Sequence, residues 1–336
     1  MSTKPRIALA LSGGGAKGAF TVGVLRALDQ LFDPFPYPVI SGTSTGSLVG
    51  TLIATNELAK LVTIYSSVQT KNIVNPNHAL VASVLGTEAV LFAAAVLGGR
   101  SIFDTKALRE TIANNTDFAK VKASKTLLIY NAVDLQTGAL RWFDNRTHPP
   151  AVLADALLAS ANMPVLMDPV DLPVGGEMHQ FVDGGVREYL PLRALFAADV
   201  EYDLIIAVAT SPTTMQREGH PIDKITKILG RTIQVFDHEV STDDYMGAQL
   251  YNAILRIVEN AKRKKIELSE ILAGIPDEVR SKLKGKVDAP LLLITPDTEL
   301  DMDSLEFEPE KMRRAMAHGT EVVKRRGDEI RRALGI

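Results

Sequence analysis

Cysteine is absent from the 336 residues of this chain, which excludes disulfide bonds and every metal or redox site that depends on thiolates. An excess of charge of one sign is also missing, because 37 Lys and Arg residues face 40 Asp and Glu residues. Proteins that bind nucleic acids normally carry a strong basic excess, so we expect no nucleic-acid partner. The lack of cysteine is compatible with a reducing compartment, and we expect a cytoplasmic protein.

Long uncharged runs are missing too, with one exception between residues 79 and 99. This segment has about the length that spans a bilayer. However, Glu88 lies near its middle and Gly86 interrupts it, and an ionisable group is costly in hydrocarbon, which disfavours a membrane span. Two alternatives remain: a pair of buried helices, or an apolar flap beside a lipid-binding site.

The rest of the chain alternates buried strands with helices. Apolar runs predict strands at 7–11, 38–40, 126–133, 202–210 and 291–294, and helical periodicity separates most of them. The run at 7–11 is too short for a secretory signal. This alternation predicts a three-layer α/β/α fold with a mainly parallel central sheet. We expect one domain over residues 1–336, with an apolar flap or membrane-contacting insertion at 60–100 and a helical insertion at 215–285.

A serine between two glycines follows the second predicted strand. Residues 40–46 are Ile-Ser-Gly-Thr-Ser-Thr-Gly, which is the G-x-S-x-G pattern of a nucleophile elbow centred on Ser44. In such a turn the serine is strained between a strand and a helix, and the glycines remove Cβ atoms that would collide. An apolar helical pattern at 48–61 follows, as the elbow requires. The pattern favours a catalytic Ser44, although Ser and Thr could instead cap a helix. The predicted elbow around Ser44 consists of Gly42, Thr43, Thr45 and Gly46.

A second glycine cluster follows the first predicted strand. Gly13, Gly15 and Gly18 satisfy the G-x-G-x-x-G pattern, so a dinucleotide-binding enzyme is an alternative. That fold needs an acidic residue at the end of its second strand, where this chain has Ser-Gly-Thr-Ser at 41–44. Lys17 precedes the last glycine, which excludes a phosphate-binding P-loop.

Backbone N–H groups at a glycine-rich helix start can instead bind an oxyanion. We therefore predict an oxyanion loop, in which Lys17 either adds positive charge at the rim or is an ordinary solvated lysine. The loop consists of Gly13, Gly14, Gly15, Ala16, Lys17 and Gly18.

The partner of a nucleophilic serine is less evident. The chain has six histidines, but none lies in a segment that matches a triad element. Asp183 ends an apolar run and precedes Gly184 and Gly185, which leaves its carboxylate accessible, although a tight turn explains the same residues. A Ser–Asp dyad is therefore favoured, and it requires a partly desolvated Asp with a raised pKa. Asp134 also follows a strand, but an Asp that caps a turn is the commoner outcome there.

Together, the clusters at 13–18, 42–46 and 183–185 resemble the patatin-like phospholipase family. Further similarities are Ala-Ser-Ala-Asn-Met-Pro at 159–164 and Leu-Pro at 190–191. The resemblance implies a patatin-like fold in which Ser44 is the nucleophile, Asp183 is its only acid/base partner, and the first cluster is the oxyanion loop.

The same resemblance implies a serine acyl hydrolase of phospholipase A or lysophospholipase type that acts on a lipid substrate at a peripheral membrane surface, the inner face for a cytoplasmic protein. No cofactor or metal is expected, and the sequence carries no signal for an oligomeric state. The alternative is a lipid-binding or regulatory protein of the same fold. One departure from the family is Arg-Glu-Tyr at 187–189, where members often have a small or amide residue, and it leaves the shape of the pocket open.

Overall fold

The computed structural model describes residues 5–32, 37–76, 101–219, 221–223, 225–264 and 289–335. The apolar segment 79–99, and with it much of the predicted flap at 60–100, lies outside the described residues. The same is true of residues 265–288 in the predicted insertion at 215–285. In the part of the chain that is described, no helix combines the length and the apolar character needed to cross a bilayer.

One sheet forms the centre of the molecule, with its strands in the order β10-β9-β1-β2-β5-β8-β7 and with β6 paired to β5 outside this path. The strands from β10 to β5 in this order are mutually parallel, whereas β6, β7 and β8 are antiparallel to their neighbours. The predicted mainly parallel sheet is therefore confirmed. The strands are β1 (Ile7–Leu11), β2 (Val39–Gly42), β5 (Leu127–Asp134), β6 (Leu140–Asp144), β7 (Val170–Val174), β8 (Glu177–Asp183), β9 (Leu204–Val208) and β10 (Leu291–Ile294). A separate pair joins β3 (Asn75–Pro76) to β4 (Phe103–Asp104).

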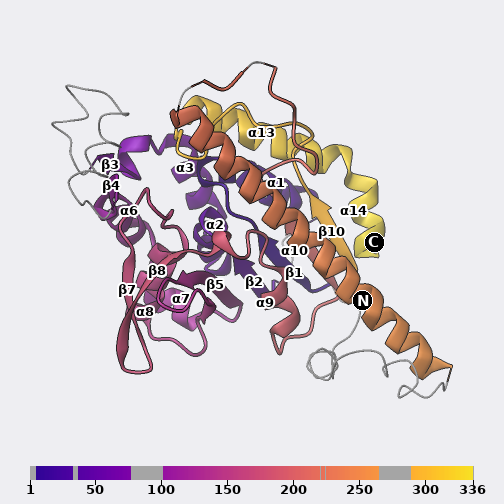
Figure 1. Ribbon diagram of the computed structural model, residues 1–336. Helices are drawn as coiled ribbons and strands as arrows, with labels where there is room; N and C mark the ends of the chain where they lie inside the picture. The colour runs from indigo at the N-terminus through magenta and orange to yellow at the C-terminus, as the bar shows by residue number, and fades with distance from the viewer. Residues whose placement is uncertain are drawn as a thin grey trace.

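Helices cover both faces of this sheet, as the alternating side chains of β1 demonstrate. Leu9 belongs to one apolar core, which α1 and α13 cover, whereas Ala8 and Ala10 belong to a second core that α9 and α10 close. Figure 1 shows α10 as the long orange helix that runs diagonally across the molecule. The predicted three-layer α/β/α fold is confirmed. The helices are α1 (Gly18–Phe32), α2 (Thr45–Ala54), α3 (Leu58–Ser67), α6 (Lys106–Asn115), α7 (Phe118–Ala123), α8 (Pro150–Ser160), α9 (Leu192–Ala197), α10 (Ile225–Arg263), α13 (Pro309–Arg325) and α14 (Gly327–Leu334), with 3-10 turns η1 (Gly15–Lys17), η2 (Thr70–Asn72) and η3 (Gly184–Val186).

Two helical segments differ from the prediction. The apolar pattern at 48–61 is divided between α2 and α3, because Asn56 adopts a left-handed conformation with φ 59° that no helix can continue through. The charged amphipathic pattern at 308–334 predicts one closing helix, but this segment is likewise divided, between α13 and α14 at Arg326, whose ψ of 10° lies outside the helical range.

The strand register brings the sequence motifs together. Leu11 at the end of β1 is level with Gly42 at the end of β2, so the loop at 13–18 and the elbow leave the sheet side by side. Ala132 of β5 is paired with Asp183, which places the end of β8 at the same edge. Carboxyl ends of parallel strands are where ligand sites form in such sheets.

Candidate active site

The structure places Ser44 in a sharp turn between β2 and α2. Its φ of 54° and ψ of −126° are strained for a residue with a side chain. A Cβ atom at Gly42 would collide with the main chain of Gly46, and one at Gly46 would collide with the carbonyl oxygen of Leu11. Both glycines are therefore required by close backbone approach, which is the geometry that the sequence pattern predicts.

Hydrogen bonds from separate elements hold this turn. The backbone N–H of Ser44 donates to Ser160 Oγ of α8 at 3.2 Å, and the Thr43 hydroxyl donates to the carbonyl oxygen of Glu188 at 2.9 Å. Thr45 Oγ1 and the Tyr65 hydroxyl of α3 lie 2.5 Å apart. The orientation of Ser44 thus depends on side chains that are distant in sequence, and the role of Ser160 is visible only in the structure.

Asp183 lies at the end of β8 beside Ser44. Its Oδ1 accepts the N–H of Gly185 at 2.8 Å, and its own N–H donates to the carbonyl oxygen of Asn162 at 2.9 Å. Burial raises the pKa of Asp183 to about 6, although hydrogen bonds from the Ser44 hydroxyl and from Gly185 N–H oppose the shift. Ser44 and Asp183 therefore lie side by side, and the pKa of Asp183 is raised in the direction that a Ser–Asp dyad would need.

The N–H groups of the glycine loop are not equivalent. Four of them donate to main-chain carbonyls: Gly13 to Tyr189 at 3.1 Å, Ala16 to Ser304 at 2.8 Å, Lys17 to Gly14 at 3.0 Å, and Gly18 to Ala16 and Gly15. For the N–H groups of Gly14 and Gly15, the described residues provide no such acceptor. Both residues line the cavity that contains Ser44. Of the six predicted loop residues, Gly14 and Gly15 alone thus combine an available N–H with a place at this cavity.

Backbone conformation makes glycine necessary at these two positions. Gly14 has a φ of 139° and Gly15 a φ of 55°, which other residues rarely adopt. A side chain at Gly14 would also collide with Thr210, and one at Gly15 with the carbonyl oxygen of Ser304.

Lys17 is not the solvated lysine that the sequence allowed as an alternative. It is only 6% exposed, and its positive charge lowers the pKa of Asp237, which lies on α10. The sequence around Lys17 does not reveal this burial, because Ser304, which packs on the loop, and Asp237 are both more than 200 residues away in the chain.

Tyr189, Asp237 and Asp244 complete the surroundings. Sequence reasoning missed both carboxylates and named Tyr189 only as part of the departure at 187–189. The buried Tyr189 hydroxyl is hydrogen-bonded to Asp237 and Thr210. Burial, together with the negative charge of Asp183, raises the pKa of Asp237 to about 7. Asp244 accepts the N–H groups of Tyr189 at 2.8 Å and Leu190 at 2.9 Å. Carboxylates of α10 therefore anchor the loop that follows Asp183.

The departure at 187–189 is accounted for by this packing. Glu188 is fully buried and accepts hydrogen bonds from Arg193 Nε at 3.1 Å and Trp142 Nε1 at 3.3 Å. Tyr189 points the other way and lines the cavity beside Asp183. Tyr189, one of the three residues at which the chain departs from the family, therefore helps to shape the pocket.

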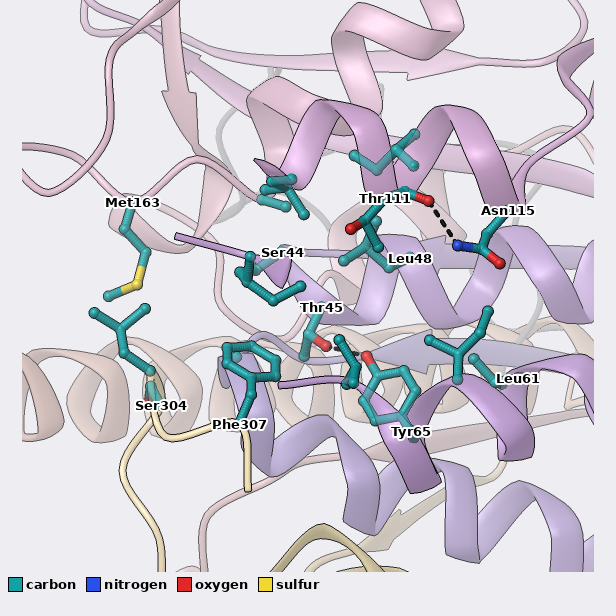
Figure 2. A pocket seen from close by; sticks show the side chains of 18 of the residues that line it. Ser44, Thr45, Leu48, Leu61, Tyr65, Thr111, Asn115, Met163, Ser304 and Phe307 are labelled. Carbon is teal, nitrogen blue, oxygen red and sulfur yellow. Dashed lines mark hydrogen bonds between the residues drawn. The ribbon is translucent and has the colours of Figure 1, made fainter. Parts of the chain in front are cut away.

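Two cavities meet at Ser44. The first, of about 90 Å³, is lined mainly by apolar side chains of α2, α3 and α6 and is closed on one side by Phe307. Figure 2 shows it extending from Ser44 towards Leu61 and Asn115. The second, of about 310 Å³, lies between the elbow and α10 and includes Asp183 and Asp237. Ser44, Gly15, Met163 and Ser304 line both.

The other candidate residues for catalysis, Asp134 and the described histidines, lie outside the two cavities. Asp134 is buried, pairs with His179 Nδ1 at 2.8 Å, and accepts the N–H of Gln136 at 3.0 Å. It therefore caps the turn between β5 and β6, and it lines neither cavity. None of the described histidines lines them either.

The model of the patatin-like phospholipase family matches residues 9–196, which contain the glycine loop, the elbow and Asp183. The chain belongs to the patatin-like phospholipase family. This family membership replaces the alternative interpretation of the chain as a dinucleotide-binding enzyme.

Individual patatin-like relatives are distant. An uncharacterized NTE family protein of Mycobacterium tuberculosis is 25% identical over 241 residues, which are 70% of this chain and 59% of the relative. Lysophospholipase NTE1 of Mycosarcoma maydis is 25% identical over 264 residues, 77% of this chain and 13% of the fungal protein. The structure of VipD from Legionella pneumophila aligns with a TM-score of 0.46 and 15% identity, covering 97% of this chain and 67% of VipD. This chain thus spans about three fifths of the mycobacterial relative and a small part of the fungal one.

Proposed function

We propose that this patatin-like protein is a serine acyl hydrolase, of phospholipase A or lysophospholipase type, that cleaves lipid acyl esters and releases free fatty acid. The observation that carries the proposal is a strained serine, Ser44, hydrogen-bonded to a buried carboxylate, Asp183, where an apolar cavity opens. A hydroxyl becomes a useful nucleophile only when a base accepts its proton. Asp183, with a pKa of about 6, is a better base near neutral pH than an ordinary Asp and is still mostly ionised there.

The proposed reaction has two halves. Ser44 Oγ attacks the ester carbonyl while Asp183 takes the hydroxyl proton, and the N–H groups of Gly14 and Gly15 stabilise the oxyanion that forms. As the tetrahedral intermediate collapses, the C–O bond to the alcohol breaks and Asp183 returns the proton to that alcohol. Water then attacks the acyl group on Ser44, again giving its proton to Asp183, and the fatty acid leaves as Ser44 recovers its proton.

The two cavities suggest how a lipid would be divided. The apolar cavity between α2, α3 and α6 suits the acyl chain, because its lining removes methylene groups from water. The second cavity, with Tyr189 and Asp237, suits the alcohol part of the ester. Ser44 would then lie at the carbonyl carbon between the two halves.

Covalent capture tests the assignment of the nucleophile. A fluorophosphonate is expected to form one adduct per chain, and mass spectrometry of the digested protein is expected to locate it on Ser44. Ser47 and Ser160, whose hydroxyls are 2.8 Å apart in the same region, serve as internal controls and should carry no adduct. An adduct on either of them, or none at all, would refute the assignment.

The acyl cavity yields a prediction about chain length. Leu61 is buried and lies towards the end of the cavity away from Met163 (Figure 2). Leu61→Phe should obstruct that end and prevent two or three methylene groups from being buried, which lowers kcat/KM for a dodecanoyl ester by roughly 30-fold relative to a butanoyl ester. The measurement is the ratio of the two kcat/KM values. Leu61→Met, which nearly conserves volume, should keep the wild-type ratio, and equal losses on both esters in the Phe variant would count against an acyl site.

A further inference from the structure

The outer face of α10 carries a straight row of apolar side chains. Its members, which we call the α10 stripe, are 47–64% exposed: Ile228, Val235, Met246, Leu250 and Ile257. Their separations of 7, 11, 4 and 7 residues each approximate a whole number of helical turns. The stripe therefore follows one side of the helix for about 44 Å.

The inner face of α10 does not need these residues. That face of the helix buries Ala248, Asn252 and Leu255. It also carries Asp237 and Asp244, which hold the loop at 189–190. A helix face turned to solvent normally carries polar side chains. An aligned set of large exposed apolar residues instead marks a surface that contacts something else.

Apolar surface continues from the stripe to the mouth of the second cavity. Phe236, next to Val235 in the chain, is 65% exposed and lines that cavity, and Val186 of η3 is 52% exposed and lines it as well. Val165, which follows the cavity residue Pro164, is 73% exposed with a φ of 69°. A β-branched residue is strained in that conformation, so the backbone here holds an apolar side chain in solvent at considerable cost.

Charge indicates the kind of surface that would be contacted. In the described part of α10 and the residue after it, the exposed cations are Lys227, Arg256, Lys262, Arg263 and Lys264, of which Arg263 pairs with Glu259. They outnumber the exposed acids Glu239 and Asp243, which lie on the stripe side of the helix between Val235 and Met246. Three of the cations are consecutive at the end of the helix. A helix with an apolar row and excess exposed positive charge suits the interface of a membrane that contains anionic lipids.

We propose that the α10 stripe docks this protein on an anionic phospholipid surface, with Phe236, Val186 and Val165 bringing the mouth of the second cavity against the lipid. Docking itself depends only on the exposed face of α10. The benefit, that a lipid enters the cavity without crossing water, rests on the proposed hydrolase function.

The test combines Met246→Ser with Leu250→Ser, because both residues belong to the stripe and neither lines the first or the second cavity. Binding to vesicles of equimolar phosphatidylcholine and phosphatidylglycerol is measured by co-sedimentation, in a Ser44→Ala background so that no lipid is consumed. Loss of two apolar anchors should weaken binding by about tenfold or more. With Ser44 present, kcat/KM for a soluble butanoyl ester should stay within about twofold of wild type, which also verifies that the double variant is folded.

A matched control replaces Leu135 and Met178 by Ser. These residues are 48% and 62% exposed but lie on the β5–β6 turn and on β8, so vesicle binding should be unchanged. Wild-type binding by the stripe variant would overturn the proposal. So would a wild-type dimer that the stripe variant converts to monomer, because the stripe would then bind a second copy of the chain. Failure to hydrolyse the soluble ester would instead refute the hydrolase function and leave the docking result intact.

Discussion

Replacement of Ser44 by alanine is expected to lower kcat/KM for a soluble butanoyl ester by about 10⁴-fold or more. The reason is that no neighbouring hydroxyl can take over. Ser47 and Ser160 are fully buried and are hydrogen-bonded to each other, and Thr45 is committed to Tyr65. Only Ser44 has both an Asp183 partner and access to the two cavities.

The measurement is initial rate against purified Ser44→Ala protein, with Ser47→Ala as the matched control that should retain activity within about tenfold. The Ser44→Ala protein should melt close to the wild-type temperature, because it loses a single oxygen that lines the cavities. Wild-type activity in the Ser44→Ala protein would refute the proposed chemistry. Lipid bound by the wild type without any product would support the lipid-binding or regulatory alternative.

The parts of the site that follow from local backbone geometry were predictable from sequence. Gly42 and Gly46 must be glycine because main-chain atoms occupy the space that their Cβ atoms would take. The five-residue G-x-S-x-G pattern contains both glycines, so the sequence alone reveals this requirement. The strands at 7–11 and 291–294 were predicted with the bounds that the structure has, since buried parallel strands are continuous apolar runs.

The parts that depend on distant contacts were not predictable. The carbonyl oxygens of Tyr189 and Ser304 accept two of the loop N–H groups, and so decide which others remain available to an oxyanion. Both residues are more than 170 residues from the loop in the sequence. Asp237 approaches Asp183 only because α10 crosses the site. Helical periodicity identified that segment as a helix, but periodicity does not state which side of a helix faces a cavity.

Asp183→Asn is the second change with a large expected effect. The amide is isosteric and its oxygen can still accept the N–H of Gly185, so the loop should keep its shape. An amide cannot accept a proton from Ser44, however, and kcat/KM on the soluble ester should fall by about 10³-fold or more. In the wild type, kcat/KM should fall about tenfold for each pH unit below 6, as Asp183, with its pKa of about 6, becomes protonated. The residual activity of the Asp183→Asn protein should lack this dependence.

The same substitution should alter stability in a pH-dependent way. Folding raises the pKa of Asp183 from 3.8 to about 6, so the folded state binds this proton more tightly than the unfolded state. The contribution of Asp183 to stability is therefore fully present below pH 3.8 and is lost as the pH rises through 6. Above that pH the buried ionised carboxylate disfavours folding, relative to its neutral form, by about 3 kcal/mol.

The amide side chain of the Asp183→Asn protein cannot ionise, so this variant should melt several degrees above the wild type at pH 8. The advantage should shrink as the pH is lowered towards 4, where the wild-type side chain is neutral as well. Thermal denaturation at the two pH values measures this directly. Asp183→Ala, which leaves the N–H of Gly185 without its acceptor, is the control that should lose activity without an equal gain in stability. A melting temperature for Asp183→Asn below that of the wild type at pH 8 would mean that the carboxylate stabilises the fold, which would contradict a base kept reactive by burial.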